Sequence, residues 1–417
     1  MAITVQQALL DVSGYTPSRL NLERLFSRPN TRSKAYSKRV SPLTSATPCI
    51  APETAPPPEL QTPYFWRLST AEVDEIENSV KHFQRLNRPL HEIDPDTFPL
   101  TASLRLKLQE VLAAVYGDHK FMILCGLDPQ RYNDVENVII HAGLSSHVGA
   151  RRGLAGYEGG DNTAVRSTGQ YHGPPNQARE IPFHTDNGDI VSLFALSTSQ
   201  SGGSFYLADS SAVYNDLVSL EPGLAKALTD DWTMIRYEAA TYALTVFLRR
   251  SLDKATIKST DLESASPSSP HKDFDKRPIA FPQSSSGQTL INCSRSRITG
   301  TPSSPRPSNL PPLTQTQKNA LDALHELARQ KALEIRLQPG DMIFFNNLST
   351  LHARDAFVDN DAIGQKRHLL RLILRNEEKA YDLPSQLKET WKGLYEHDRQ
   401  EELFPVKSEL FTFASTH

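Results

Sequence analysis

The segment 366–375, Lys-Arg-His-Leu-Leu-Arg-Leu-Ile-Leu-Arg, constrains the fold of this chain more than any other part of the sequence. Successive side chains of a β-strand point to opposite faces. A strand here would place a leucine-rich face on a core, formed by His368, Leu370, Leu372 and Leu374. Its other face would mix charged and apolar side chains, namely Arg367, Leu369, Arg371 and Ile373. Because two residues of the mixed face are also apolar, the sequence predicts a strand covered on both sides, in a fold of more than one layer.

The two arginines of the mixed face are predicted to point into a half-enclosed cavity. A buried guanidinium is costly unless an anion pairs with it, and arginine is well suited to bind a carboxylate through two hydrogen bonds. Arg367 and Arg371 are therefore candidates for binding anionic groups. The alternative is that both side chains lie on the exposed face of an edge strand.

Short strand patterns separated by Gly, Asn and Ser recur through the rest of the chain. Strands are predicted over 121–125, 181–184, 190–196, 204–208, 332–337 and 341–346. Apolar residues at helical spacing predict helices over 70–86, 101–116 and 315–330. Repeated βαβ units are not evident. The predicted fold is therefore mainly β with flanking helices, an α+β class built around antiparallel strands.

Composition divides the chain near residue 63. Residues 41–63 are rich in Pro, Ser, Thr and Ala, a composition that cannot bury enough apolar surface to offset the entropy lost on ordering. Residues 1–63 are therefore predicted to be a disordered or loosely attached N-terminal extension. Residues 64–417 are predicted to form one domain with Ser/Pro-rich insertions near 251–286 and 300–312.

The charge balance excludes some classes of partner. Lys and Arg number 45 against 48 Asp and Glu, a net charge of −3, which argues against the basic surface that nucleic acids or anionic membranes require. With only three scattered cysteines, the chain is expected in a reducing compartment, the cytoplasm. Residues 1–50 hold seven Lys or Arg and two Asp or Glu, so mitochondrial import stays an alternative. The sequence does not indicate the oligomeric state.

A candidate metal-binding pair, His184 and Asp186, lies at the end of a predicted strand. Residues i and i+2 of a strand share a face, so an imidazole and a carboxylate could bind one ion. A third imidazole would complete the 2-His-1-carboxylate triad of non-haem Fe(II) enzymes, which leaves positions open for a cosubstrate and O₂. A second pair of this kind, His271 and Asp273, follows a Ser/Pro-rich run without an apolar strand beside it. We therefore favour the first pair.

The third ligand is expected from a strand far along the chain. His352, in the sequence Leu-Ser-Thr-Leu-His-Ala-Arg, offers this position. The alternative is a core histidine that is hydrogen-bonded to the backbone. The arginine pair in the following strand favours the ligand interpretation, because an anionic cosubstrate would need a cation near the metal.

Taken together, these motifs resemble the taurine dioxygenase (TauD/TfdA-like) family of Fe(II)/2-oxoglutarate oxygenases. The matching residues are His184-x-Asp186, Gly202-Gly203-Ser204, Gly340-Asp341, Asn347, Leu351-His352-Ala353-Arg354 and Arg367-His368-Leu369-x-Arg371. Residues 188–193 and 346–349 are similar to fungal members of the family, which are associated with natural-product pathways.

The resemblance implies a double-stranded β-helix (jelly roll) core in a catalytic domain over 64–417. It implies that His184, Asp186 and His352 bind Fe(II), with 2-oxoglutarate and O₂ as cosubstrates. Arg367 would pair with the distal carboxylate of 2-oxoglutarate, and Arg371 would meet an anionic group of the substrate. The implied reaction oxidises a C–H bond of a small acidic molecule, an amino acid or a natural-product intermediate, and releases succinate and CO₂. Halogenating relatives lack the carboxylate, so the presence of Asp186 argues against halogenation.

The chain departs from the family pattern at one place. Family members commonly carry Gly-Gly-(Glu/Asp)-Thr, with the Thr helping to hold 2-oxoglutarate, whereas this chain has Ser204 and then Phe205 after the two glycines. Either Ser204 supplies the hydroxyl through a local shift, or Arg367 holds the carboxylate alone. Both alternatives stay open.

The main alternative to an enzyme is a non-catalytic jelly-roll relative that binds a ligand and recruits a partner through its basic N-terminal tail. A zinc hydrolase with the same triad is disfavoured, because it would not need the paired arginines. Among other candidates, Asn292 begins a glycosylation sequon within a predicted strand and is discounted. His172 is either a pocket or a loop residue, and Arg295 and Arg297 either reach the cavity mouth or lie on the surface.

Overall fold

The structure is a computed structural model that describes residues 64–154, 163–166, 178–235, 274–284, 286–300, 305–360, 362, 365–402 and 404. The predicted N-terminal extension 1–63 lies outside these residues. The same is true of residues 251–273, 285 and 301–304 of the two predicted insertions.

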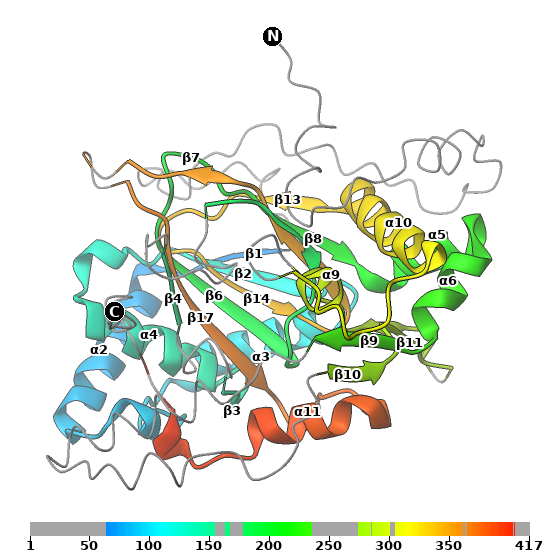
Figure 1. Ribbon diagram of the computed structural model, residues 1–417. Coiled ribbons are helices and arrows are strands. Elements are labelled where there is room, and N and C mark those ends of the chain that lie inside the picture. The colour runs from blue at the N-terminus through cyan, green and yellow to red at the C-terminus, as the bar shows by residue number, and fades with distance from the viewer. Residues whose placement is uncertain are drawn as a thin grey trace, which may run out of the picture.

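Two β-sheets face each other at the centre of the molecule (Figure 1). The larger sheet has the order β1-β2-β14-β6-β17-β3, with β4 also paired to β17. Its strands are β1 (Phe65–Arg67), β2 (Phe121–Cys125), β3 (Arg151–Arg152), β4 (Thr163–Arg166), β6 (Ile190–Ser197), β14 (Met342–Asn346) and β17 (His368–Arg375). The smaller sheet has the order β13-β8-β15-β5. Its strands are β5 (Ile181–His184), β8 (Phe205–Asp209), β13 (Leu333–Ile335) and β15 (Thr350–Arg354).

Strand pairing in both sheets is antiparallel, apart from the parallel pair β1 and β2. Three smaller ladders flank the sheets. They join β7 (Ser201–Gly202) to β16 (Phe357–Val358), β9 (Trp232–Ile235) to β10 (Phe274–Arg277) and β11 (Ala280–Pro282) to β12 (Thr289–Ile291). The end of the first predicted insertion is therefore regular structure, because Ile279 and Ala280 are buried apolar residues rather than part of a solvated loop.

Helices cover the outer face of each sheet (Figure 1). The larger sheet packs on α2 (Thr70–Leu86), α3 (Ala102–Tyr116) and α4 (Asp134–Ser146). The smaller sheet packs on α5 (Ser210–Leu220), α6 (Pro222–Thr229) and α10 (Gln315–Lys331). The remaining helical segments are α9 (Arg295–Thr299), α11 (Ser385–Tyr395), and the 3₁₀ turns η3 (Leu90–Glu92), η4 (Pro129–Arg131) and η8 (Arg399–Glu401). The predicted class, mainly β with flanking helices, is confirmed.

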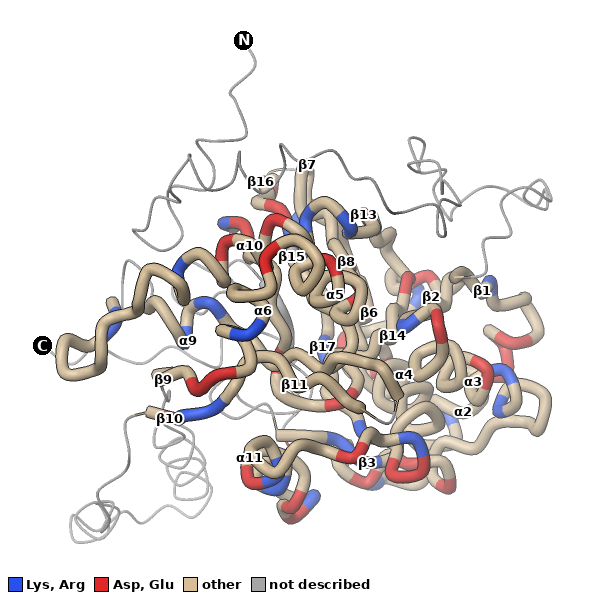
Figure 2. Tube along the Cα trace, turned by 90° about the vertical axis from the view of Figure 1, so that its right-hand side faces the viewer, with Lys and Arg blue, Asp and Glu red and all other residues tan. Residues whose placement is uncertain are grey.

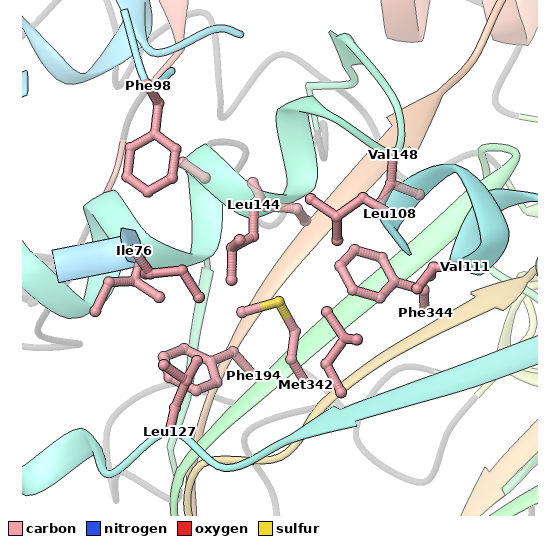
Figure 3. Close-up of a cluster of buried hydrophobic side chains, with 14 of the residues drawn as sticks. Ile76, Phe98, Leu108, Val111, Leu127, Leu144, Val148, Phe194, Met342 and Phe344 are labelled. Carbon is pink, nitrogen blue, oxygen red and sulfur yellow. The ribbon is translucent and has the colours of Figure 1, made fainter. Parts of the chain in front are cut away.

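The apolar core beneath α2, α3 and α4 holds the larger sheet in place. Figure 3 shows side chains from helices and from the larger sheet packing together there, for example Ile76 from α2, Leu144 from α4 and Phe344 from β14. Each of these three side chains is fully buried. At roughly 25 cal/mol for each Å² of apolar surface removed from water, such packing is the main source of stability for this layer.

The two faces of β17 pack as the alternation predicts. Leu370, Leu372 and Leu374 lie in the core shared with the helices. Leu369 and Ile373 lie instead in the core between the two sheets. The strand itself begins at His368, so Arg367 immediately precedes the ladder with β6. The side chains of Arg367 and Arg371 are buried, which is inconsistent with an exposed face of an edge strand.

Within the described residues, no helix combines the length and apolar character needed to cross a bilayer. Figure 2 shows basic and acidic residues interspersed along the described chain, and α11 carries both. This distribution agrees with the small net charge of the sequence.

Candidate metal centre and cosubstrate site

Three potential metal ligands meet at one edge of the smaller sheet. His184 ends β5, and His352 lies directly opposite it on the neighbouring strand β15. Their ring centroids are 4.0 Å apart. Asp186 follows two residues after His184, and one ligand atom from each of the three side chains lies within 4.8 Å of the others. Among the described residues, these three form the group of His, Cys, Asp and Glu side chains that lie close enough together to bind one metal ion.

The hydrogen bonds indicate which imidazole nitrogens face the centre. His184 Nδ1 lies 2.9 Å from the carbonyl oxygen of Pro182. A carbonyl only accepts, so Nδ1 carries the proton and the lone pair of Nε2 is left for a metal. His184 Nε2 and His352 Nε2 each lie 3.8 Å from a carboxylate oxygen of Asp186. These separations exceed hydrogen-bond length and suit three ligands that converge on one ion.

The electrostatics favour the protonation states that bind metals. Burial raises the pKa of the Asp186 carboxyl, but Arg371, His352 and His184 together lower it by more, so the pKa lies below its ordinary value. Burial lowers the pKa of His352 well below its ordinary value, and the neighbouring His184 lowers it further. At neutral pH the carboxylate is therefore ionised and the imidazole neutral, which are the forms that ligate a cation.

Arg371 lies next to the metal ligands. Its Nη1 is 3.4 Å from Oδ2 of Asp186, and only 9% of its side chain is exposed. The predicted position, on the cavity side of β17, agrees with this contact. A buried cation thus lies in contact with one of the three potential metal ligands.

Arg367, four residues before Arg371 in the chain, is also buried. Its Nη1 has no hydrogen-bond partner within the described part of the chain, and its guanidinium lies 5.5 Å from the centre of the Phe357 ring. Burial lowers the pKa of Arg367 to about 10, while Asp359 opposes the shift. A buried cation with an unpartnered N–H is the arrangement expected of a site that binds an anion.

Arg354 is a second buried cation beside Arg367; the sequence motif includes this residue, but its place next to Arg367 was not predicted. Its guanidinium lies 4.7 Å from the centre of the same Phe357 ring. Burial lowers the pKa of Arg354 to about 9, and the charge of Arg367 contributes. Unlike Arg367, Arg354 donates to backbone carbonyls, those of Asp355 and Arg179. We therefore regard it as a support for the cationic pocket rather than its main anion ligand.

The two glycines of the Gly-Gly pair allow β7 to approach β16 closely. Gly202 and Gly203 have φ values of 71° and 75°, in the left-handed region that favours glycine. A Cβ on Gly202 would collide with the carbonyl oxygen of Ala356, and one on Gly203 would lie 3.6 Å from Cδ of Arg367. The glycine pair therefore sets the position of the chain beside Arg367.

Ser204 does not join this group. Its hydroxyl donates to Oε1 of Glu334 on β13 at 2.8 Å. The next residue, Phe205, points the other way, into the core between the sheets, where its ring lies 5.9 Å from that of His352. Because neighbouring residues of an extended chain face opposite sides, the geometry does not support the expected role of Ser204 in binding 2-oxoglutarate. The alternative in which Arg367 acts without that hydroxyl fits better.

The other candidates from the sequence lie away from the centre or outside the described residues. Arg295 pairs with Asp322 at 2.6 Å, and Arg297 pairs with Asp275 at 2.5 Å. These ion pairs join α9 to α10 and to β10. His172 and the second candidate pair, His271 and Asp273, lie outside the described residues.

Comparisons with known proteins agree with this geometry. The model of the "Taurine catabolism dioxygenase TauD, TfdA family" matches residues 86–373, more than half of the chain. The chain belongs to this family. The "Taurine hydroxylase-like protein SAT17" of Stachybotrys chartarum (strain CBS 109288 / IBT 7711) is 30% identical over 348 residues, which cover 81% of this chain and 82% of that protein.

Solved structures place the fold among the TauD-like jelly-roll oxygenases. An asparagine oxygenase in complex with Fe(II), 2S,3S-3-hydroxyasparagine and succinate superposes with a TM-score of 0.54 at 15% identity, over 75% of this chain and 93% of that one. The non-haem iron oxygenase OrfP with Fe and α-ketoglutaric acid gives a TM-score of 0.51 at 16% identity, over 75% and 94%. The jelly-roll core implied by the sequence resemblance is confirmed.

The protein is thus a TauD/TfdA-family dioxygenase that uses Fe(II), 2-oxoglutarate and O₂. The residues present fit these groups. Two imidazoles and one carboxylate form the donor set of non-haem iron enzymes. The unpartnered N–H of Arg367 suits the distal carboxylate of the cosubstrate. Loss of a metal ligand would have favoured the alternative of a non-catalytic ligand-binding protein. All three potential ligands are present and lie together, so this alternative gains no support.

Proposed function

We propose that this oxygenase oxidises a C–H bond of a small acidic substrate, an amino acid or a natural-product intermediate, with release of succinate and CO₂. The observation that carries the proposal is the position of Arg371. Its guanidinium is buried and contacts the metal-ligating carboxylate of Asp186. A cation in that place would attract and orient an anionic group of a substrate beside the metal.

The ligands of the solved relatives support an amino-acid substrate. The asparagine oxygenase structure contains 2S,3S-3-hydroxyasparagine and succinate. One OrfP structure contains Fe, succinate and (3S)-hydroxy-L-Arg. The bound hydroxyasparagine and hydroxyarginine are both amino acids, so each carries a carboxylate that a buried arginine could bind.

Each group of residues in the site has a separate proposed role. His184, Asp186 and His352 would hold the iron and leave its remaining positions open to one side. When bound, the iron and 2-oxoglutarate supply the O₂-dependent oxidation chemistry. Arg367 would bind the distal carboxylate of the cosubstrate, and Arg371 would fix the acidic group of the substrate.

Apolar rings would keep water from the reacting groups. Phe345 and Phe205 lie 5.0 Å and 5.9 Å from the ring of His352, measured between ring centroids. Both belong to the buried core between the sheets. Excluding water strengthens the interaction of each buried charge with its partner and limits side reactions.

The test is a substrate screen followed by a comparison of variants. The enzyme is incubated with Fe(II), 2-oxoglutarate, ascorbate and individual amino acids or small acids, and succinate release is measured for each additive. For the active additives, Arg371→Ala should raise the apparent KM by about 100-fold, since truncating one partner of a buried ionic contact costs about 2–5 kcal/mol.

The matched control is Arg336→Ala, because Arg336 is exposed and its side chain pairs with Glu334, away from the metal ligands. It should leave the KM unchanged. An active panel whose KM values do not respond to Arg371→Ala, or a preferred substrate without an anionic group, would refute the acidic-substrate proposal.

A further inference from the structure

We infer that Asn292 and Asn347 form an amide clamp that positions Asp186 for metal binding. The inference rests on the metal centre of the proposed function but concerns residues outside the ligand set. Both side chains reach the same backbone carbonyl, that of Asp186, although they follow different strands, β12 and β14. We call this pair the amide clamp.

Asp186 needs such support because it lies beyond the end of a strand. The ladder of β5 ends at His184, so the sheet does not fix the backbone of Asp186. A carboxylate binds an ion well only when its backbone is held, since its oxygen must stay within a few tenths of an ångström of the normal bonding distance to the ion. The required hydrogen bonds must therefore come from side chains.

Asn347 makes three hydrogen bonds in this turn, two of them to the backbone of Asp186. Its Oδ1 accepts from the backbone N–H of Asp186 at 2.9 Å. Its Nδ2 donates to the carbonyl of Asp186 at 2.8 Å and to that of Gly188 at 2.7 Å. The side chain of Asn347 is fully buried, so water cannot replace these bonds without a rearrangement. One amide thus satisfies both polar backbone groups of Asp186.

Asn292 completes the clamp from the other side. It directly follows β12, and its Nδ2 donates to the carbonyl of Asp186 at 3.1 Å. The guanidinium of Arg277 donates to Oδ1 of Asn292, which fixes the orientation of the amide and directs Nδ2 toward Asp186. Arg277 itself is buried.

Thr185 and Cys293 add two further hydrogen bonds to the same turn. The N–H of Thr185 donates to the carbonyl of Cys293 at 2.8 Å, and the N–H of Cys293 donates to Oγ1 of Thr185 at 2.9 Å. The turn that carries Asp186 is thereby tied to the segment after β12. Loss of either clamp residue should loosen the carboxylate while the two histidines stay on their strands.

The clamp makes a quantitative prediction about metal affinity. Partners that orient a metal ligand typically cost about 10–100-fold in metal affinity when they are removed. Asn347→Ala removes three hydrogen bonds and should raise the Kd for Mn(II), used as a stable stand-in for Fe(II), within that range. Asn292→Ala removes one bond to Asp186 and should raise the Kd by about 3–10-fold.

The matched control is Asn137→Ala in α4. Asn137 is also buried, and its Nδ2 also donates to backbone carbonyls, including those of Pro129 and Tyr132. It belongs to the helical layer on the far side of the larger sheet. Its replacement should lower the melting temperature but leave the Kd for Mn(II) within about twofold of the parent value.

The experiment measures the Mn(II) Kd by calorimetry on the full chain, without 2-oxoglutarate, together with the melting temperature of each variant. A rise in Kd for Asn347→Ala and Asn292→Ala, but not for Asn137→Ala, is the expected result. If Asn347→Ala does not fold, Asn347→Ser and Asn292→Ala give the same comparison. The clamp is refuted if its variants lose stability, as Asn137→Ala does, yet keep the parent Kd.

This readout is separate from the test of the proposed substrate. A failure of the acidic-substrate proposal would leave the metal constants unaffected. A parent protein that releases succinate with a preferred acid, combined with clamp variants that bind Mn(II) normally, would overturn only the clamp.

Discussion

His184 and His352 lie opposite each other on neighbouring strands of the smaller sheet, with ring centroids 4.0 Å apart. The cross-strand pairing of β5 with β15 is therefore what brings two remote parts of the chain to one metal centre. Side chains directly opposite each other in an antiparallel pair lie on the same face. The two histidines are placed by strand register, so a shift of one residue between these strands would separate them.

Arg367→Lys tests whether the buried guanidinium recognises 2-oxoglutarate. Lysine keeps the positive charge but loses the planar fork that binds a carboxylate through two hydrogen bonds. The KM for 2-oxoglutarate is expected to rise by about 10-fold in Arg367→Lys and by about 100-fold or more in Arg367→Ala. The readout is succinate release as a function of 2-oxoglutarate concentration; equal KM values in all three proteins would contradict the assignment.

Ser204→Ala tests the alternative that the structure disfavours. The hydroxyl of Ser204 donates to Glu334, so its removal should leave the KM for 2-oxoglutarate within about twofold of the parent value and cost about 1 kcal/mol of stability. The same succinate assay and a urea titration check both expectations. A tenfold rise in KM would restore Ser204 to the cosubstrate site.

Gly202→Ala tests the close approach of β7 and β16. The new Cβ would collide with the carbonyl of Ala356, so the chain next to Arg367 should shift and the KM for 2-oxoglutarate should rise. The matched control is Gly287→Ala, since Gly287 has a similar φ of 69° but no atom within 4 Å of the new Cβ. Both variants should lose about 1 kcal/mol from backbone strain, and only Gly202→Ala should change the KM.

The stability of the metal-free protein should fall as the solution becomes acidic. Burial lowers the pKa of His325 to about 4, from 6.5 in the unfolded chain. The unfolded state therefore binds more protons between these two values, so the free energy of unfolding is largest above pH 6.5 and decreases as the pH falls toward 4. Each unit of pKa difference corresponds to about 1.4 kcal/mol.

The contribution of His325 can be isolated with His325→Phe, which keeps an aromatic ring against Phe183. Urea titrations at several pH values should show a shallower loss of stability in the variant between pH 6.5 and about pH 4. The same slope in both proteins would mean that His325 titrates normally in the folded state.

Local patterns made several elements predictable from the sequence. The helix α2 begins after Ser69, whose side chain and Glu72 form a capping box, and its buried residues follow the helical period. The alternation in β17 correctly predicted which residues face the helices and which face the space between the sheets. Both predictions depend only on neighbours in the chain, which is why they succeed.

Other elements were not predictable because their pattern depends on distant partners. Helix α4 is buried on nearly every side from Asn137 to Ser146, so it lacks the polar face that reveals an amphipathic helix. The pairing of β15 with β5 likewise joins strands that lie far apart in the sequence, so no local pattern predicts it.

The roles of individual polar side chains were the least predictable. Asn347 was recognised as part of a motif, but its bonds to Asp186 depend on a turn far away in the sequence. Ser204 was one of two alternatives for holding the cosubstrate because of its place after two glycines, whereas its hydroxyl donates to Glu334. At the end of a strand, a shift of one residue turns a side chain to the opposite face of the sheet. The local sequence does not determine which face the side chain takes.

Anaerobic Fe(II) titration of the parent protein and of His184→Ala, His352→Ala and His271→Ala tests the central claim most directly. We predict that the parent and His271→Ala bind one Fe(II) per chain, while His184→Ala and His352→Ala lose this binding, because each removes one of three ligands. Retention of stoichiometric Fe(II) binding by His184→Ala and His352→Ala would contradict the assignment of the metal centre.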